Sequence, residues 1–169
     1  SSGAGTSSVK NAFNHLFERV GAKPIVIEGD SFHRYDREEM KRVMEKKEKI
    51  GNRYFSHFGP EANLFGELEK TFKEYGEKGH CKRRYYIHTD EEGEPFGKKA
   101  GEFTPWEDVG RNSDLLFYEG LHGGVKDGTI DVAKYVDLLI GVVPVVNLEW
   151  IQKIHRDKEQ RGYSAEATV

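Results

Sequence analysis

The chain has 169 residues, of which 33% are charged, and a formal net charge of −3 at pH 7. This length fits one domain with a buried core, and the charge balance gives no reason to expect binding to nucleic acid. No apolar run approaches the roughly 20 residues of a membrane-spanning helix, so no membrane association is expected. Because Cys81 is the only cysteine, an internal disulfide is excluded and a cytoplasmic location is expected.

The first residues, SSGAGTSS, allow two interpretations. Segments rich in Ser and Gly are common linkers left by expression vectors. The same residues also resemble the phosphate-binding P-loop pattern G-x-x-x-x-G-K-[ST], with Gly5 as the second glycine and Ser7 in the hydroxyl position. Thr6 stands where the pattern has lysine, and the first glycine of the pattern would precede Ser1.

An amphipathic helix is predicted directly after this segment and ends at Gly21. Its apolar residues recur at helical spacing and share one face: Val9, Ala12, Phe13, Leu16, Phe17 and Val20. A Gly-rich turn before a helix N-terminus directs backbone N–H groups and the positive end of the helix dipole at an anion. The pattern therefore favours a phosphate-binding loop over a linker.

Strands and helices are predicted to alternate along the rest of the chain. Short apolar runs predict strands at residues 23–30, 82–88, 113–120 and 135–144. Helical periodicity predicts helices at residues 36–51, 61–76 and 145–162, and the Gly-, Glu- and Lys-rich segment 89–111 is expected to be a surface loop. The pattern indicates the α/β class, a three-layer sandwich with a mainly parallel sheet, whose ligands bind at the carboxyl ends of the strands.

One acid and three basic residues follow the strand predicted at 23–30. Asp30 comes directly after the strand, and His33, Arg34 and Arg37 follow before the next helix. In one interpretation these are solvated loop residues, beside a capping box that begins at Asp36. In the other, they bind a phosphorylated ligand with a free hydroxyl, whose proton the acid accepts and whose phosphate the bases hold.

A second acid lies at the end of the strand predicted at 113–120. The stretch LLFYEG ends its apolar run in Glu119, as a Walker B strand does with the carboxylate that holds Mg²⁺ directly or through water. Many buried strands end in an acid, so this pattern is informative only together with the P-loop.

A basic cluster lies on the helix predicted at 145–162. Four charged residues share one face, namely Lys153, Arg156, Asp157 and Arg161. Leu148, Ile151 and Ile154 share another face and are expected in the core. Basic residues suit a helix C-terminus on electrostatic grounds alone, but they also suit the charge stabilisation that phosphoryl transfer requires.

Together these motifs resemble the phosphoribulokinases of the bacterial type. The stretches that carry the resemblance are SSGAGTS, IEGDSFHRYDREEMK, FSHFGPEAN, LLFYEGLHGG, IGVVPVVNLEWIQKIHRD and RGY. In that family the P-loop similarly carries threonine in place of lysine. The resemblance implies ATP- and Mg²⁺-dependent phosphorylation of D-ribulose 5-phosphate to the 1,5-bisphosphate of the Calvin cycle, by an enzyme that forms a homo-oligomer. Because the family members extend further at both ends, residues 1–169 are expected to be a single kinase domain truncated at both ends.

The resemblance also implies roles for individual residues. Asp30 would be the general base, with Arg156 and Asp157 as further catalytic residues. The P-loop would bind ATP through Ser2, Gly3, Ala4, Gly5, Thr6 and Ser7, and Mg²⁺ would be held by Ser7, Glu119 and Asp157. The sugar phosphate would contact His33, Arg37, Lys41, His88, Lys153 and Arg161. Arg19 matches a position linked in the family to the response to allosteric effectors.

Two other functions remain open on the sequence. A uridine-kinase-like enzyme would share the P-loop and the acid near residue 30 but would act on a neutral acceptor and need fewer basic residues there. A non-catalytic nucleotide-binding regulator of the GTPase type usually carries Asn-Lys-x-Asp, and no asparagine in this chain is followed by lysine.

Overall fold

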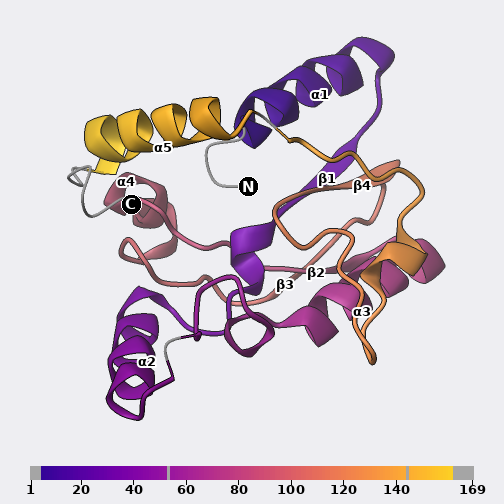
Figure 1. Ribbon diagram of the computed structural model, residues 1–169. Coiled ribbons are helices and arrows are strands. Elements are labelled where there is room, and N and C mark those ends of the chain that lie inside the picture. Colours follow the sequence, from indigo (N-terminus) through magenta and orange to yellow (C-terminus); the bar gives the residue numbers. More distant parts are fainter. Residues whose placement is uncertain (1–4, 53, 144, 162–169) are drawn as a thin grey trace.

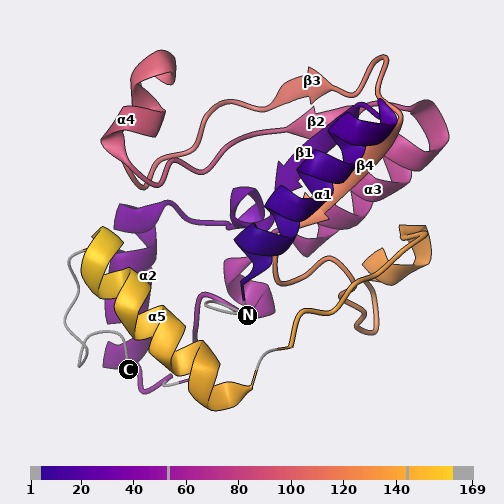
Figure 2. The same cartoon turned by 90° about the horizontal axis from the view of Figure 1, so that it is seen from above.

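The computed structural model describes residues 5–52, 54–143 and 145–161 (Figure 1). Its helices are α1 (Thr6–Val20), α2 (Arg37–Lys49), α3 (Phe65–Lys78), α4 (Asp90–Gly93) and α5 (Val146–Arg161). Strands β1 (Pro24–Glu28) and β4 (Leu115–Glu119) pair in parallel, whereas β2 (Cys81–Arg83) and β3 (Glu107–Val109) pair antiparallel. Helices α1 and α3 lie on opposite sides of the β1–β4 pair, so three layers form and the predicted α/β class is confirmed (Figures 1 and 2).

The α1 helix forms where the spacing of apolar residues predicts it. Gly5 and Gly21 bound the helix with backbone φ angles of 86° and 72°, in the left-handed region that glycine adopts without strain. Phe13 and Phe17 pack on Phe117 of β4, with ring centroids 5.4 and 5.6 Å apart. This contact holds α1 across the sheet and directs its N-terminus toward the carboxyl ends of the strands.

The predicted capping box begins α2. The Asp36 carboxylate accepts a hydrogen bond from the backbone N–H of Glu39 at 2.7 Å, and the Glu39 carboxylate accepts one from the N–H of Asp36 at 3.2 Å. Such caps stabilise a helix by about 1 kcal/mol. The cap sets the point at which the loop after β1 turns into α2.

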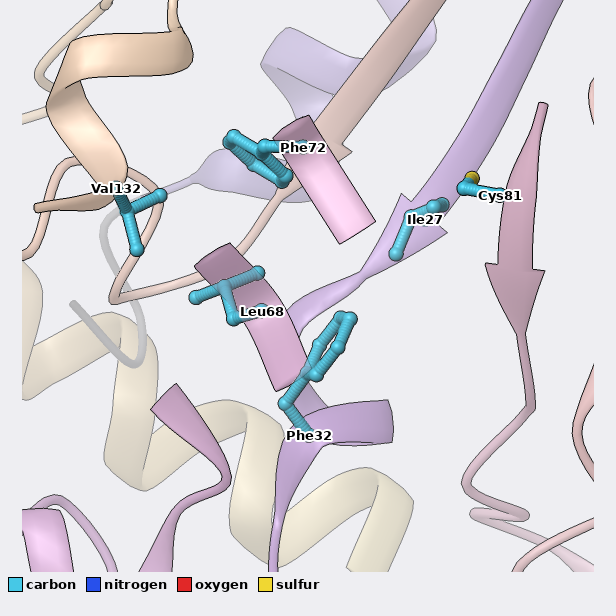
Figure 3. Packing of buried hydrophobic residues seen from close by; sticks show 6 residues of the cluster. All are labelled: Ile27, Phe32, Leu68, Phe72, Cys81 and Val132. Atoms are coloured by element: carbon cyan, nitrogen blue, oxygen red, sulfur yellow. The ribbon is translucent and has the colours of Figure 1, made fainter. Parts of the chain in front are cut away.

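The buried core lies beneath the loop that carries Asp30. Its central residues come from β1, the following 3₁₀ turn, α3, β2 and the segment after β4 (Figure 3), and they are Ile27, Phe32, Leu68, Phe72, Cys81 and Val132. Burying a side chain of this size stabilises the fold by about 1.5–3 kcal/mol relative to exposure. The end of β1 is therefore held by packing on several elements.

One predicted strand does not form. Residues 132–135 make a 3₁₀ turn, and residues 136–143 make no strand pairing within the described part of the chain. Leu138 and Val143 are 73% and 89% exposed. The apolar composition of 135–144 suggests burial, but a strand also needs a neighbouring strand to take its hydrogen bonds, and no described strand lies alongside.

The boundaries of other elements differ from the predicted ones. The helix predicted at 61–76 begins only at Phe65, after a 3₁₀ turn at Pro60–Ala62, and ends at Lys78 with Gly79 as its cap, instead of at Gly76. The strand predicted at 82–88 is limited to β2, and the loop predicted at 89–111 contains α4 and β3.

The apolar face of α5 is not in the core. Leu148 and Ile151, which the periodicity assigns to the core, are 48% and 64% exposed. Periodicity identifies an amphipathic helix but does not specify what covers its apolar face. None of the described helices is long and apolar enough to cross a membrane.

Candidate functional site

A tight 3₁₀ turn at Gly29–Phe32 places Asp30 at the carboxyl end of β1. Phe32 and Ser31 are 2% and 1% exposed, whereas the Asp30 side chain is 52% exposed. A Cβ atom at Gly29 would lie 2.9 Å from the backbone Cα of Gly120 and 2.6 Å from the Tyr118 hydroxyl, so a larger residue here would have to displace the backbone that follows β4. The turn thus buries its neighbours in the core and presents one carboxylate outward.

Two histidines flank the Asp30 carboxylate. The Nε2 atom of His33 lies 3.4 Å from one carboxylate oxygen, and the Nε2 atom of His88 lies 3.8 Å from the other. Burial acts to lower the pKa of His33, but its hydrogen bond to Asp30 and the Asp30 charge outweigh this effect, with a further contribution from Asn63. The pKa of His33 is therefore raised above its ordinary value of 6.5, which favours an imidazolium beside the carboxylate.

A cavity of about 1320 Å³ opens beside Asp30, between its loop and α2. It brings together the predicted base and four of the predicted sugar-phosphate ligands: Asp30, His33, Arg37, Lys41 and His88. Most of these residues come from a short stretch, and His88 approaches from the segment after β2. The lining also includes four further acids, Asp36, Glu38, Glu45 and Glu48. The cationic groups close to Asp30 in the sequence and in the cavity suit a phosphorylated ligand that carries a hydroxyl.

Asn63 is a functional residue that the sequence analysis does not single out. Its side-chain amide donates hydrogen bonds to the backbone carbonyls of His57 and Gly59, both at 2.8 Å, and its Oδ1 lies 3.0 Å from Nδ1 of His33. Because the amide nitrogen is engaged as a donor, Oδ1 accepts, and Nδ1 of His33 carries the hydrogen. This contact turns Nε2 of His33 toward Asp30.

Tyr86 is a second residue of the site that the sequence analysis does not single out, and its ring contacts both His33 and His88. Its ring lies edge-on to His33 at 6.1 Å and to His88 at 5.1 Å between centroids. An aromatic wall of this kind restricts both imidazoles to few orientations. Only the stretch YYIH, next to the predicted His88, gives a sequence signal for it.

The N-terminus of α1 and the ends of β1 and β4 form a second charged region. Lys10 of α1 donates a hydrogen bond to Glu28 at 2.6 Å, and Glu28 is the register partner of Glu119 in the sheet. Burial acts to lower the pKa of Lys10, but Glu28, followed by Glu119, raises it overall. One cation of the P-loop helix therefore faces the acids at the strand ends.

The structure describes the remaining predicted site residues only in part. Ser2, Gly3 and Ala4 lie outside the described residues, Gly5 precedes α1, and Thr6 and Ser7 begin it. The residues predicted on α5, namely Lys153, Arg156, Asp157 and Arg161, all lie within that helix. Lys153 and Arg156 are not among the described residues that line the cavity beside Asp30, and the side chains of Asp157 and Arg161 lie outside what the structure describes. Their convergence on Asp30 stays a prediction.

An α/β fold with a Gly-capped helix leading from the P-loop segment, and with acids at the ends of parallel strands, is the arrangement of a P-loop phosphotransferase. A family model described as "Phosphoribulokinase / Uridine kinase family" matches residues 1–169, and the chain belongs to this family.

Within this family, the chain is similar to several phosphoribulokinases. The chain is 61% identical over all 169 residues to the chromosomal phosphoribulokinase of Cupriavidus necator and 56% identical to the phosphoribulokinase of Nitrobacter vulgaris. It spans 58% of the length of each of these relatives. Among solved structures, a phosphoribulokinase from Rhodobacter spheroides matches 96% of this chain and 56% of its own, with a TM-score of 0.83 and 49% identity. A putative fructose transport system kinase from Silicibacter, 16% identical with a TM-score of 0.68, matches all of this chain and 73% of its own and shares the fold.

Proposed function

We propose that the protein is a phosphoribulokinase that transfers the γ-phosphoryl group of ATP to the 1-hydroxyl of D-ribulose 5-phosphate. The observation that carries the proposal is the Asp30 carboxylate, flanked by His33 and His88 in a cavity that also holds Arg37 and Lys41. The 52–61% identity to phosphoribulokinases over the whole chain supports the same assignment. A role in the Calvin cycle, a cytoplasmic location and a homo-oligomeric state follow as parts of the proposal, with residues 1–169 within one kinase domain.

Asp30 acts as the general base in this proposal. A sugar hydroxyl is a poor nucleophile until its proton is accepted, and a carboxylate at the carboxyl end of a strand can accept it as the hydroxyl attacks the phosphorus atom. His33 and His88 flank the carboxylate, and His33 as an imidazolium also binds the sugar phosphate together with Arg37 and Lys41.

In this proposal ATP binds at the second charged region, formed by the N-terminus of α1 and the ends of β1 and β4. The residues of the P-loop segment that the structure describes, Gly5 to Ser7, would meet the ATP phosphates at the N-terminus of α1. Oxygen donors are what Mg²⁺ prefers, and the half-buried Glu119 carboxylate at the end of β4 fits that need together with Ser7 and Asp157. When bound, the metal would neutralise developing charge on the phosphates. Arg156, Lys153 and Arg161 would add positive charge from α5.

The direct test is an ADP-release assay of the whole protein with alternative acceptors. ADP release that depends on ribulose 5-phosphate and not on uridine is the expected result. Release with uridine would favour the uridine-kinase-like alternative, whose neutral acceptor has no use for Arg37 and Lys41. Release without any acceptor would favour a nucleotide-hydrolysing regulator.

Arg37→Ala is expected to raise KM for ribulose 5-phosphate by about tenfold or more, because a charge-assisted contact contributes roughly 1.5–3 kcal/mol. KM for ATP should change less than twofold by this argument. Arg42→Ala is the matched control, since Arg42 lies exposed on the same helix and does not line the cavity. Equal increases in both KM values would assign Arg37 a structural role instead.

The raised pKa of His33 predicts a pH-dependent KM for the sugar phosphate. The imidazolium form exists below its pKa, so binding should be tightest there and should weaken as the pH rises through the raised pKa, above 6.5. A loss of one charge-assisted contact corresponds to an increase in KM of about tenfold. His33→Gln should abolish this step in a profile of KM against pH, and a step that persists in this variant would assign it to another group.

A further inference from the structure

Arg84 makes two hydrogen bonds to the backbone of the turn that carries Asp30. Its Nε atom donates a hydrogen bond to the carbonyl of Ser31 at 2.7 Å, and one terminal nitrogen donates to the carbonyl of His33 at 2.6 Å. These two carbonyls lie on either side of Phe32, directly after Asp30. A single guanidinium therefore spans the turn that carries the proposed base and its histidine partner.

Two aromatic rings position this guanidinium. Its central carbon lies 3.7 Å from the centroid of Phe103 and 4.7 Å from that of Trp106, and the Trp106 ring also packs on Phe32 at 5.8 Å. Burial lowers the pKa of Arg84 to about 10, so the group keeps its charge at neutral pH. The planar fork of arginine can make both hydrogen bonds while stacking between rings, whereas a lysine ammonium cannot reproduce that geometry.

We propose that Arg84 is a positioning residue that sets the Asp30 carboxylate and the His33 imidazole in their relative orientation by fixing the carbonyls of Ser31 and His33. This inference rests on the proposed function, in which Asp30 is the base. Arg84 is not among the described residues that line the cavity, and it holds the turn through these two backbone carbonyls. Its positive charge also acts directly on His33 and lowers the pKa of that imidazole, so the test must separate charge from geometry. A misplacement of about 1 Å in a reacting group can lower a rate by roughly a hundredfold, so loss of these two hydrogen bonds should lower kcat.

The test compares Arg84→Ala with Arg84→Lys and with the control Arg83→Ala in the whole protein. Arg83 neighbours Arg84, but its guanidinium pairs with Glu107 and lies over Tyr85, away from the Asp30 loop. Arg84→Ala and Arg84→Lys should both lower kcat by about 10- to 100-fold and leave KM for ATP within about twofold. Added guanidinium ion at millimolar concentration should restore at least part of kcat in Arg84→Ala, because it fits the space between the rings and can donate to both carbonyls.

A second readout does not depend on turnover. The imidazole ¹⁵N signals of His33, identified by their loss in His33→Gln, should shift in Arg84→Ala, return toward wild type with guanidinium, and stay unchanged in Arg83→Ala. They should also shift in Arg84→Lys, which keeps the positive charge that acts on His33 but not the geometry of the guanidinium. Retained kcat in Arg84→Lys, or His33 signals that do not shift in this variant, would overturn the proposal. If Arg84→Ala does not fold, Arg84→Lys decides by the same two readouts. A wild type that is inactive on ribulose 5-phosphate, with His33 signals that still respond to Arg84, would refute the proposed function and leave the positioning role intact.

Discussion

Asp30→Asn is expected to lower kcat for ribulose 5-phosphate phosphorylation by about 10²–10⁴, the usual contribution of general acid–base catalysis. Asparagine keeps the size and hydrogen-bonding capacity of the side chain but cannot accept a proton at neutral pH. The Asp30 side chain is half-exposed and its neighbours Ser31 and Phe32 carry the packing, so the folded state and the affinity for ATP should change little. Steady-state kinetics with both substrates, together with thermal unfolding, measure these effects separately.

Asp36→Asn is the control for removing a carboxylate from the same cavity. Asp36 also lines the cavity, but its carboxylate accepts the N–H of Glu39 as the cap of α2, and asparagine caps a helix comparably well. This variant should therefore keep kcat within a fewfold of the wild type. If Asp30→Asn keeps more than about a tenth of wild-type kcat, a loss below the range of general-base catalysis, Asp30 is not the base and the proposed chemistry is wrong.

The parts of the site that sequence reasoning predicts are those built by local chemistry. Asp30, His33 and Arg37 follow one strand within eight residues, so a strand, a tight turn and a capped helix are enough to bring them to one cavity. The capping box at Asp36 and Glu39 and the glycine at the end of α1 are signals of the same local kind, and both helices begin or end at these residues.

The parts that sequence reasoning misses depend on distant partners. Asn63 meets His33 across 30 residues, and Arg84 meets Ser31 across 53, so no spacing along the chain marks either contact. The segment 135–144 illustrates the opposite error, because its apolar composition suggests a buried strand while pairing requires a neighbour that composition cannot identify. Placing α5 relative to Asp30 is limited in the same way, since helical periodicity indicates a face but not its partner.

Asn63→Ala is expected to lower the free energy of unfolding by about 1–3 kcal/mol, because a buried side chain loses three partly buried hydrogen bonds together. Asn63 is 2% exposed, and its amide satisfies the carbonyls of His57 and Gly59 as well as Nδ1 of His33. Alanine provides neither donor nor acceptor and leaves a gap the size of an amide. Chemical denaturation of wild type and variant measures the difference.

Asn52→Ala is the matched control, since the side-chain Oδ1 of Asn52 accepts an exposed hydrogen bond from the N–H of Tyr54 two residues later, and its loss should cost less than about 1 kcal/mol. The hydrogen bond that Asn63 accepts from His33 also contributes to the raised pKa of His33, so Asn63→Ala should shift the His33 titration to lower pH. The two effects have one cause, because the same amide stabilises the loop before α3 and orients the imidazole toward Asp30. A variant as stable as the wild type, with an unchanged His33 titration, would mean that water replaces the amide and that Asn63 does not connect the fold to the site.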